Sequence, residues 1–579
     1  MKNIKLKIVP ILSFVFSFMA LVLISSSKVN GYEHSIYSGT PNFSFIFLIL
    51  STIFGVYLIL TQENPNFIFW RLGYLNILLN NVILILLPVL KGYAFNERSD
   101  VLTHIGYVID INTIGHFDSD NFYPITHILL SEISQVANLQ AITTFRLSPS
   151  IFYVIFALNM YFFAKSIFED NRIISMVVAS SSILFLGKYQ TMIVPNGICN
   201  MFFPLVLAIY FKNFEVKATK FAIPLVLFLI VFPFFHPLSS LALILAFITI
   251  EISKYVLSKF TSCNKVTITH ILILSLTFIT WISSYVVWSR SVRGVFNKLS
   301  NEITATPIDA MVTDLTKINI TLLDFIELFI RLYGITILYI LFSFIGIYYI
   351  AICIHNKDNT YYKISILALC LIFFLIFCIL MLFIPLGFSP LRIVTYINII
   401  SLVVGSFGLF KLSKQKIKNQ YLVFLLLLIP LTIGIFNIYD SPLVMKPNPQ
   451  ITSEEYCGWG WFFDHKEEHI QVRGIMSSQP YRFFDFLHGF EGRLNRKDVN
   501  PQAPSVPDHF SYNESSQIGD SYTNPIYIPL STYDKKLYVD VWNMVGRYNE
   551  TDFELLERDE SAFLFYSSNG FDVWYITPR

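Results

Sequence analysis

The sequence predicts an all-α polytopic membrane domain of about 13 transmembrane helices, followed by a small C-terminal α/β domain. Of the 579 residues, 54% are hydrophobic and only 14% are charged, whereas globular proteins are about a quarter charged. Many apolar runs approach the length of about 18 residues that crosses a bilayer core of about 30 Å. Basic and acidic residues nearly balance, at 41 and 39, so the overall charge does not indicate a nucleic-acid partner.

The apolar runs predict thirteen spans. They lie at residues 8–25, 43–61, 72–90, 149–167, 173–187, 195–211, 218–235, 237–253, 268–288, 325–353, 364–385, 391–410 and 420–438. The runs 218–235 and 237–253 meet at His236-Pro237. We interpret them as a hairpin, because a single span would place two lysine-bearing loops on opposite sides of the membrane.

Lysine residues gather in the short loops on one side of this topology. They are Lys2, Lys5, Lys7, Lys212, Lys217, Lys220, Lys254, Lys259, Lys265, Lys357, Lys363, Lys411, Lys414, Lys416 and Lys418. Because cytoplasmic loops are rich in lysine and arginine, we expect a cytoplasmic N-terminus and an extracytoplasmic C-terminal domain. The N-x-Ser/Thr sequons support this orientation, since all of them fall outside. They are at Asn42, Asn319, Asn513 and Asn549.

The predicted outer side holds two long loops, 91–148 and 289–324, and the C-terminal region 439–579. Residues 1–71 would contribute two extra spans before a transmembrane module at 72–438. No internal repeat at the period of a solenoid is visible in the chain.

Turn and cap signals predict a mixed α/β domain in the C-terminal region. The Pro-rich stretch Ser441–Gln450 is interpreted as a linker. Thr452 and Glu455 have the spacing of a capping box at the start of a helix. Asn569-Gly570 lies between two alternating segments and predicts a β-hairpin.

The loop 91–148 contains the polar residues best suited to chemistry. On a helix, Asp100, His104 and Tyr107 fall on one face, beside an apolar stripe. Such a helix would lie in the membrane interface with its polar side toward water. Asp100 and His104 can serve as a general base and its orienting partner, or as two ligands of a divalent cation. Glu97 could take either role. A solvated loop at the membrane interface is expected to carry such residues even where they have no chemical function.

A second short amphipathic helix is predicted at residues 125–136, after the break at Asn121-Phe-Tyr123-Pro124. It carries His127. Both Tyr123 and His127 are candidate substrate-binding residues because they stand in the same loop as Asp100.

Three more polar residues stand at predicted outer ends of spans. A guanidinium at Arg392 can bind a phosphate bidentately at headgroup level, although an arginine there also serves as an interfacial anchor. His236 lies in a tight turn, where histidine more often caps backbone carbonyls than contacts a substrate. Lys188 supplies a further cation in the short loop before Pro195.

The arrangement of these loops resembles the GT-C superfamily of polytopic glycosyltransferases, which includes many archaeal membrane proteins. The resemblance covers roughly residues 72–410, where a long loop, a short loop at 188–194, a tight turn at His236 and a second long loop follow one another. Asp100 corresponds to the acidic position of that superfamily. The Tyr123-Pro124 stretch and Arg392 resemble two further family features, the second a contact to the lipid phosphate.

Some features depart from that pattern. Two spans precede the module, and no Asp-x-Asp or Asp-Glu pair stands at the acidic site around Asp100. The Trp-Trp-Asp sequence of oligosaccharyltransferases is missing as well, because Trp459-Gly-Trp461 differs from it. The missing acidic pair weakens the case for a metal site, and no metal ligand set is assigned. The missing Trp-Trp-Asp sequence argues against the oligosaccharyltransferase branch.

The resemblance implies a membrane glycosyltransferase that moves a sugar from a polyprenyl (dolichyl) phosphate to an acceptor on the outer face, with inversion. The acceptor could be a glycan, a lipid or a protein. Asp100 would act as the base, and Arg392, with Lys188 or His236, would neutralise the phosphate. No cofactor is assigned with certainty, and a divalent cation stays an open alternative.

A polytopic transporter or lipid-linked saccharide flippase is the alternative. A transporter or flippase would be indicated by ionisable residues at mid-span, or by paired breaks in helices near the bilayer centre. The spans contain polar residues such as Asn76, Asn80 and Arg331, but the sequence shows no recurring ionisable series. The polar residues instead gather outside the membrane, which favours the enzyme.

Overall fold

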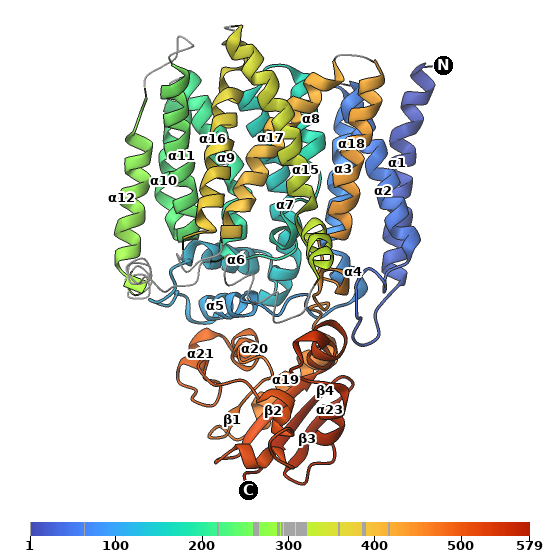
Figure 1. The fold of residues 1–579 in the computed structure, drawn as a ribbon, viewed down its shortest axis with the longest axis vertical. Coiled ribbons are helices and arrows are strands. Elements are labelled where there is room, and N and C mark those ends of the chain that lie inside the picture. The colour runs from blue at the N-terminus through green and yellow to red at the C-terminus, as the bar shows by residue number, and fades with distance from the viewer. Residues whose placement is uncertain are drawn as a thin grey trace.

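A computed structural model of the chain describes residues 2–62, 64–216, 219–258, 266–285, 321–356, 359–384, 390–414 and 417–579, together with residues 290, 293, 294 and 307. A layer of upright helices stands above a smaller domain that contains the sheet (Figure 1). The two chain ends lie at opposite ends of the molecule. Most of the predicted loop 289–324, with the sequon at Asn319, lies outside the described residues.

Nine helices in the described ranges are long and apolar enough to cross a membrane. They are α1 (Lys2–Ser26), α2 (Asn42–Gln62), α3 (Ile68–Ile85), α7 (Ala141–Ile167), α9 (Pro195–Val216), α11 (Pro237–Leu257), α15 (Leu322–His355), α16 (Tyr362–Met381) and α17 (Val394–Ser413). Three further apolar helices stand beside them: α10 (Thr219–Phe235), α12 (Thr269–Ser283) and α18 (Ile417–Phe436). The chain is a multi-pass membrane protein, as predicted, and the hairpin at His236 is confirmed.

The predicted span 173–187 is only partly helical. α8 (Asn171–Ser181) has 11 residues and therefore reaches about 16 Å, roughly half of a bilayer core. Residues 182–186 continue the crossing without helical structure and are buried, before the short helix η1 (Gly187–Gln190). Non-helical backbone is tolerated at this depth where protein surrounds it, and an apolar run cannot distinguish this case from a continuous helix.

α17 forms the centre of the bundle, with α15 packed closely along it. The two backbones approach at Gly346 and Gly408, where a Cβ on Gly408 would lie 2.6 Å from the Gly346 nitrogen. Small residues permit such close packing where no hydrophobic force drives helices together in lipid. This close packing against α15 fixes the position of α17 and of the residues at its lower end.

The polar residues predicted in the early spans serve to join helices. The Ser17 hydroxyl of α1 lies within hydrogen-bonding distance of the amide oxygens of Asn76 and Asn80 on α3, at 3.0 and 2.7 Å. Asn76 in turn donates to the Ser51 carbonyl of α2 at 3.1 Å. These buried groups are satisfied within the bundle, so they do not indicate a transport path. The boundary predicted at residue 71, between the two extra spans and the transmembrane module, stays a prediction.

Three short helices lie across the lower end of the bundle (Figure 1): α4 (Leu87–Lys91), which directly precedes the loop 91–148, and α5 (Val101–Ile114) and α6 (Pro124–Val136) within that loop. Val101, Leu102, Ile105 and Val108 are fully buried, as predicted for the apolar side of α5. The polar side is only partly open to water, because α20 (Gln479–His488) and α21 (Phe490–Leu494) pack against it at Thr103 and Tyr107, whereas Asp100 stays exposed. Gly106 allows this approach, since a Cβ there would lie 2.7 Å from the Asp485 carbonyl oxygen.

The lower domain contains a four-stranded sheet in the order β1-β2-β4-β3, with β1 parallel to β2 and the other pairs antiparallel. The strands are β1 (Gln471–Val472), β2 (Ile526–Ser531), β3 (Ala562–Ser568) and β4 (Phe571–Ile576). The predicted hairpin is β3–β4, and the predicted helix is α19 (Ser453–His465), whose Glu455 N–H is capped by Thr452. The small C-terminal α/β domain is therefore confirmed. Its other helical elements are α22 (Thr532–Lys536), α23 (Glu550–Leu556), η4 (Pro442–Val444), η5 (Asp508–Ser511), η6 (Ile518–Ser521), η7 (Leu537–Val541) and η8 (Asn543–Val545).

A buried ion pair joins the loop 91–148 to this domain. Arg98 donates to both carboxylate oxygens of Glu455, with one contact at 2.6 Å, and the two side chains are 7% and 2% exposed. The Arg98 guanidinium also lies 4.3 Å from the centre of the Tyr533 ring. The predicted linker takes part in this joint, because the Gln450 carbonyl accepts a hydrogen bond from Arg98.

We expect Arg98→Met to destabilise the protein by about 3–5 kcal/mol, because it leaves the Glu455 carboxylate buried and unpaired. Thermal unfolding in detergent measures the loss, and limited proteolysis should show the lower domain cut sooner. Arg579→Met is the matched control, since it breaks an ion pair whose side chains are 53% and 76% exposed and should change stability by less than about 1 kcal/mol. Equal effects of the two variants would contradict a structural role for the buried pair.

Candidate functional site

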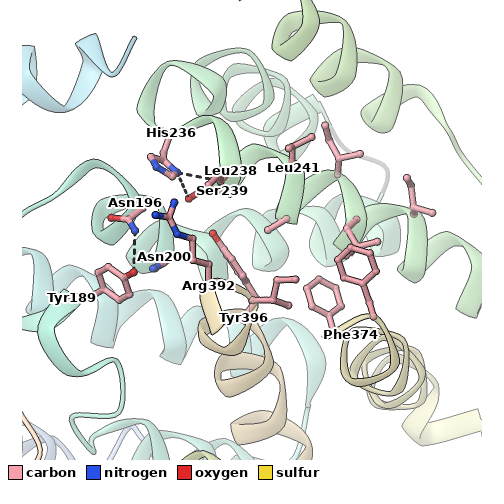
Figure 2. A pocket seen from close by; sticks show the side chains of 16 residues that line it. Tyr189, Asn196, Asn200, His236, Leu238, Ser239, Leu241, Phe374, Arg392 and Tyr396 are labelled. Carbon is pink, nitrogen blue, oxygen red and sulfur yellow. Dashed lines mark hydrogen bonds between the residues drawn. The ribbon is translucent and has the colours of Figure 1, made fainter. Parts of the chain in front are cut away.

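A cavity of about 320 Å³ opens at the lower end of the bundle, between α9, α11, α16 and the start of α17 (Figure 2). One part of its wall is apolar and the other is polar. The lining residues are Tyr189, Asn196, Asn200, His236, Leu238, Ser239, Leu241, Ala242, Ile244, Leu245, Ile248, Phe374, Phe377, Arg392, Ile393 and Tyr396. Leu241 and Ile248 are 40% and 38% exposed on the bundle surface, so the apolar part extends to the face that lipid covers.

Arg392 dominates the polar part. It lies in η3 (Pro390–Ile393), directly before α17, and makes no ion pair or hydrogen bond to any residue that the structure describes. Asn196 and Asn200 stand one turn apart on α9 and both line the cavity. The Asn200 side chain is almost fully buried and its amide oxygen has no hydrogen-bond partner in the described part of the chain. The Asn196 amide nitrogen donates to the Tyr189 hydroxyl at 3.0 Å. A guanidinium without an ion-pair partner among the described residues favours an anionic ligand.

His236 reaches the same cavity from the turn between α10 and α11. Its Nδ1 accepts the Ser239 N–H at 3.3 Å, so it caps a helix N-terminus rather than backbone carbonyls. Burial, together with the charges of Arg392 and His104, lowers its pKa to about 3. The ring is therefore neutral at pH 7 and carries its proton on Nε2, which has no partner among the described residues and can donate to a ligand.

Tyr123 connects the cavity to the loop helix. Its ring stacks on His236 at 5.4 Å and meets the His104 ring edge-on at 6.0 Å. Burial and the Asp100 charge raise the pKa of Tyr123 and the Arg392 charge lowers it, with a net rise to about 12. The predicted site residues Asp100, His104, Tyr123, His236 and Arg392 therefore gather in one region.

His104 and His127 form a buried hydrogen-bonded pair, with His104 Nδ1 and His127 Nε2 at 3.0 Å. The Asn121 amide nitrogen and oxygen lie 2.8 and 3.1 Å from His127 Nδ1, and the oxygen also accepts the Tyr123 N–H. If the amide nitrogen donates to His127, then His127 Nε2–H donates to His104 and His104 keeps its proton on Nε2; if His127 Nδ1–H donates to the amide oxygen, then His104 Nδ1–H donates to His127 and His104 Nε2 carries a lone pair. In both arrangements His127 and Asn121 orient the His104 ring.

Asp100 lies at the N-terminus of α5, with its side chain 73% exposed. Its carboxylate forms an ion pair with Arg482 of α20. The lower domain thus orients the predicted base, and sequence reasoning missed Arg482 because no local pattern marks it. Asn196 and Asn200 were also missed, although their i, i+4 spacing was visible in the sequence.

Lys188 lies apart from this group. It forms ion pairs with Glu97 at 2.9 Å and with Asp440. Burial alone would lower the pKa of Lys188, but the two carboxylates raise it above its usual value. Its charge is already balanced by two acidic side chains, which leaves little positive charge for a phosphate.

The described residues contain no ligand set for the divalent cation that the sequence left open. Among the described residues, no group of three or more His, Cys, Asp or Glu side chains could hold a metal ion. Asp118 and Asp120 form an Asp-x-Asp sequence further along the loop, beyond α5. The Asp118 carboxylate accepts the Asp120 N–H at 2.6 Å, which is the geometry of a local turn.

Two solved structures resemble the chain over much of its length. One is an oligosaccharyltransferase from Archaeoglobus fulgidus, tethered to an acceptor peptide with the NVT sequon, at 12% identity and a TM-score of 0.47, covering 87% of this chain and 74% of that protein. The other is ArnT from Cupriavidus metallidurans bound to undecaprenyl phosphate, at 9% identity and a TM-score of 0.48, covering 87% and 98%. Both are GT-C glycosyltransferases.

No protein-family model and no curated protein matches the sequence. At TM-scores below 0.5, the two structural likenesses assign neither a substrate nor a residue role to this chain. The roles of Asp100, His104 and Arg392 therefore stay predictions that depend on the geometry described above.

We expect the stability of the protein to fall as the pH drops below about 6.5, because burial lowers the pKa of His104 to about 4 and that of His127 also falls. Between these values the unfolded chain binds protons that the folded histidines exclude. The Asp100 charge opposes this shift for His104 and the Arg482 charge supports it. Thermal unfolding between pH 7.5 and 5 should show a flatter profile for a His104→Gln/His127→Gln variant.

His469→Gln serves as the control for this series, since His469 is a 78% exposed imidazole in the lower domain. Its profile should follow that of the unchanged protein. A double variant whose profile is as steep as that of the unchanged protein would show that the buried pair does not set the pH dependence.

Proposed function

We propose that the protein is a membrane glycosyltransferase that takes a sugar from a polyprenyl phosphate carrier, such as a dolichyl phosphate, and transfers it to an acceptor on the outer face of the membrane. The observation that carries this proposal is the cavity of about 320 Å³, which combines an apolar part open toward lipid with a polar end around Arg392. A ligand with a long hydrocarbon tail and an anionic head matches both parts.

The polar end has the donors that a phosphate requires. Arg392 supplies a fixed positive charge, and the His236 Nε2–H and the Asn196 and Asn200 amides can donate further hydrogen bonds. Charge-assisted hydrogen bonds of this kind are the strongest that side chains make. The same groups would stabilise the negative charge that develops on the phosphate as it leaves the sugar.

The acceptor side is formed by the loop helix. Asp100 is a carboxylate within electrostatic range of Tyr123, whose pKa also responds to the charge of Arg392. As a general base, Asp100 would take the proton of the acceptor hydroxyl while the new bond forms at the anomeric carbon and the bond to phosphate breaks. Base and phosphate on opposite sides of that carbon would produce inversion.

The lysine distribution supports the proposed orientation of this site. With the N-terminus in the cytoplasm, the cavity mouth, α5 and the lower domain are on the outer side. The lower domain would then help to bind the acceptor, since Arg482 reaches Asp100 from it. The acceptor would approach from the outside, where a glycan, lipid or protein can meet the carrier.

A flippase for lipid-linked saccharides is the alternative, and a cluster at the other end of the bundle favours it. Lys254 and Glu251 form a buried ion pair at 2.8 Å, with His270 at 3.5 Å from Glu251, beside a cavity of about 610 Å³. Ionisable residues within spans often mark a path for polar groups. A reconstituted protein that moves labelled polyprenyl-phosphate sugar across vesicles without transferring it would support the flippase.

We expect Arg392→Ala to weaken the binding of polyprenyl phosphate by about 10- to 100-fold, because a charge-assisted hydrogen bond contributes about 1.5–3 kcal/mol. Arg392→Lys should lose less, since it keeps the charge but not the bidentate geometry. Binding in nanodiscs measures both. The control is Arg331→Ala, which removes a cation paired with Glu327 on α15. Equal tolerance of Ala and Lys at position 392 would make Arg392 an anchor only.

We expect Asp100→Asn to reduce sugar transfer by at least about 100-fold, as loss of a general base does, while polyprenyl phosphate still binds. Transfer from polyprenyl-phosphate sugars to a panel of acceptors measures the change. Asp118→Asn, which removes an acidic side chain from the same loop, should retain activity. Transfer by Asp100→Asn at more than a few per cent of the unchanged rate would remove Asp100 from the base role.

A further inference from the structure

A second cavity, of about 200 Å³, lies beside the first, and Tyr189 lines both. It is bounded by the non-helical segment after α8, by α15 and by the start of α17. Its lining residues are Leu184, Phe185, Leu186, Gly187, Tyr189, Leu332, Tyr333, Ile335, Thr336, Leu391, Val394, Thr395, Asn398 and Asn437. We name it the neutral cavity, because none of these lining residues is charged.

The polar groups of the neutral cavity are amides and hydroxyls. Thr336, Thr395, Asn398 and Asn437 supply them, and such groups both donate and accept hydrogen bonds. Phe185, Tyr189 and Tyr333 add aromatic surface. A ligand that has hydroxyl groups around an apolar ring face fits this wall, whereas a charged ligand would be buried here without a partner for its charge.

Asn398 provides an independent sign of a ligand. The residue is 8% exposed, and its amide oxygen has no hydrogen-bond partner in the part of the chain that the structure describes. A buried carbonyl oxygen left without a donor destabilises a protein by about 1–3 kcal/mol. A hydroxyl group in the neutral cavity would satisfy this oxygen.

The position of the neutral cavity relates it to the phosphate end of the first cavity. Leu391 lines the neutral cavity and the adjacent Arg392 lines the first one, both from η3. Figure 2 shows Tyr189 on one side of Arg392 and Phe374, in the apolar part, on the other. A group attached to a phosphate at Arg392, on the side away from the lipid tail, would therefore extend past Tyr189.

We propose that the neutral cavity binds the sugar ring of the lipid-linked donor, and that this sugar is a single uncharged pyranose rather than a uronic acid or an amino sugar. This inference rests on the proposed function, since it presumes a polyprenyl phosphate at Arg392. The volume supports one ring, because sites for larger organic ligands occupy about 300–1,000 Å³. Asn398 accepts a hydroxyl of the ring, and the aromatic side chains contact its apolar face.

The test compares three ligands in nanodiscs that contain the full chain: polyprenyl phosphate, polyprenyl-phosphate hexose and polyprenyl-phosphate hexuronate. The neutral hexose lipid should bind about tenfold more tightly than the sugar-free lipid, as one satisfied buried acceptor predicts, and the hexuronate lipid should gain nothing. Asn398→Leu should reduce the tenfold gain to less than about twofold, and leave the affinity for the sugar-free lipid unchanged.

Thr395→Val is the second variant, in case Asn398→Leu folds poorly, and Thr432→Val is the matched control. The Thr432 hydroxyl donates to the Leu428 carbonyl within α18 and does not line the neutral cavity. Failure of all three lipids to bind would overturn the proposed function. Equal binding of the lipids with and without sugar, or a gain that survives both variants, would overturn only the sugar site. An equal gain in affinity for the hexose lipid and the hexuronate lipid would contradict the proposal that the bound sugar is uncharged.

Discussion

The buried ion pair between Arg98 and Glu455 is the contact on which the arrangement of the outer side depends. It holds the start of the loop 91–148 against the lower domain, and the guanidinium is covered by the Tyr533 ring. α5 begins immediately after this contact, so its position between the bundle and α20 follows from it. Because burying two charges is favourable only when they stay paired, the loop and the lower domain act as one structural unit.

Burial divides the polar residues of the site into two groups. The histidines are held neutral, since burial lowers the pKa of His104 to about 4 and that of His236 to about 3. Arg392 keeps its charge, because a guanidinium does not lose its proton in proteins. A neutral donor such as the His236 Nε2–H can approach a phosphate beside Arg392 without repelling the arginine. Among the described residues, the lining of the first cavity thus has one positive charge and several neutral donors, which suits a monoanionic phosphodiester better than a more highly charged phosphate.

Local patterns predicted the parts of the fold that local forces determine. Runs of apolar residues located the spans, and the Asn569-Gly570 turn and the Thr452 cap located two elements of the lower domain, because each signal needs only neighbouring residues. The break after Ser181 could not be predicted, since a buried non-helical crossing has the same composition as a helix. Lys188 was expected to face a phosphate, but its partners Glu97 and Asp440 come from distant parts of the chain. Arg482 was missed for the same reason: only tertiary packing brings it to Asp100.

That non-helical crossing links the fold to the proposed chemistry. A continuous helix through residues 182–187 would use its backbone amides and carbonyls for its own hydrogen bonds, and its side chains would fill the space beside α15 and α17. The non-helical segment instead leaves room for the neutral cavity, with Gly187 in the left-handed region at a φ of 57° where a side chain would be strained. The interrupted span is therefore explained better as a wall of the neutral cavity than as a defect in the bundle, and this explanation requires neither of the two neighbouring structures.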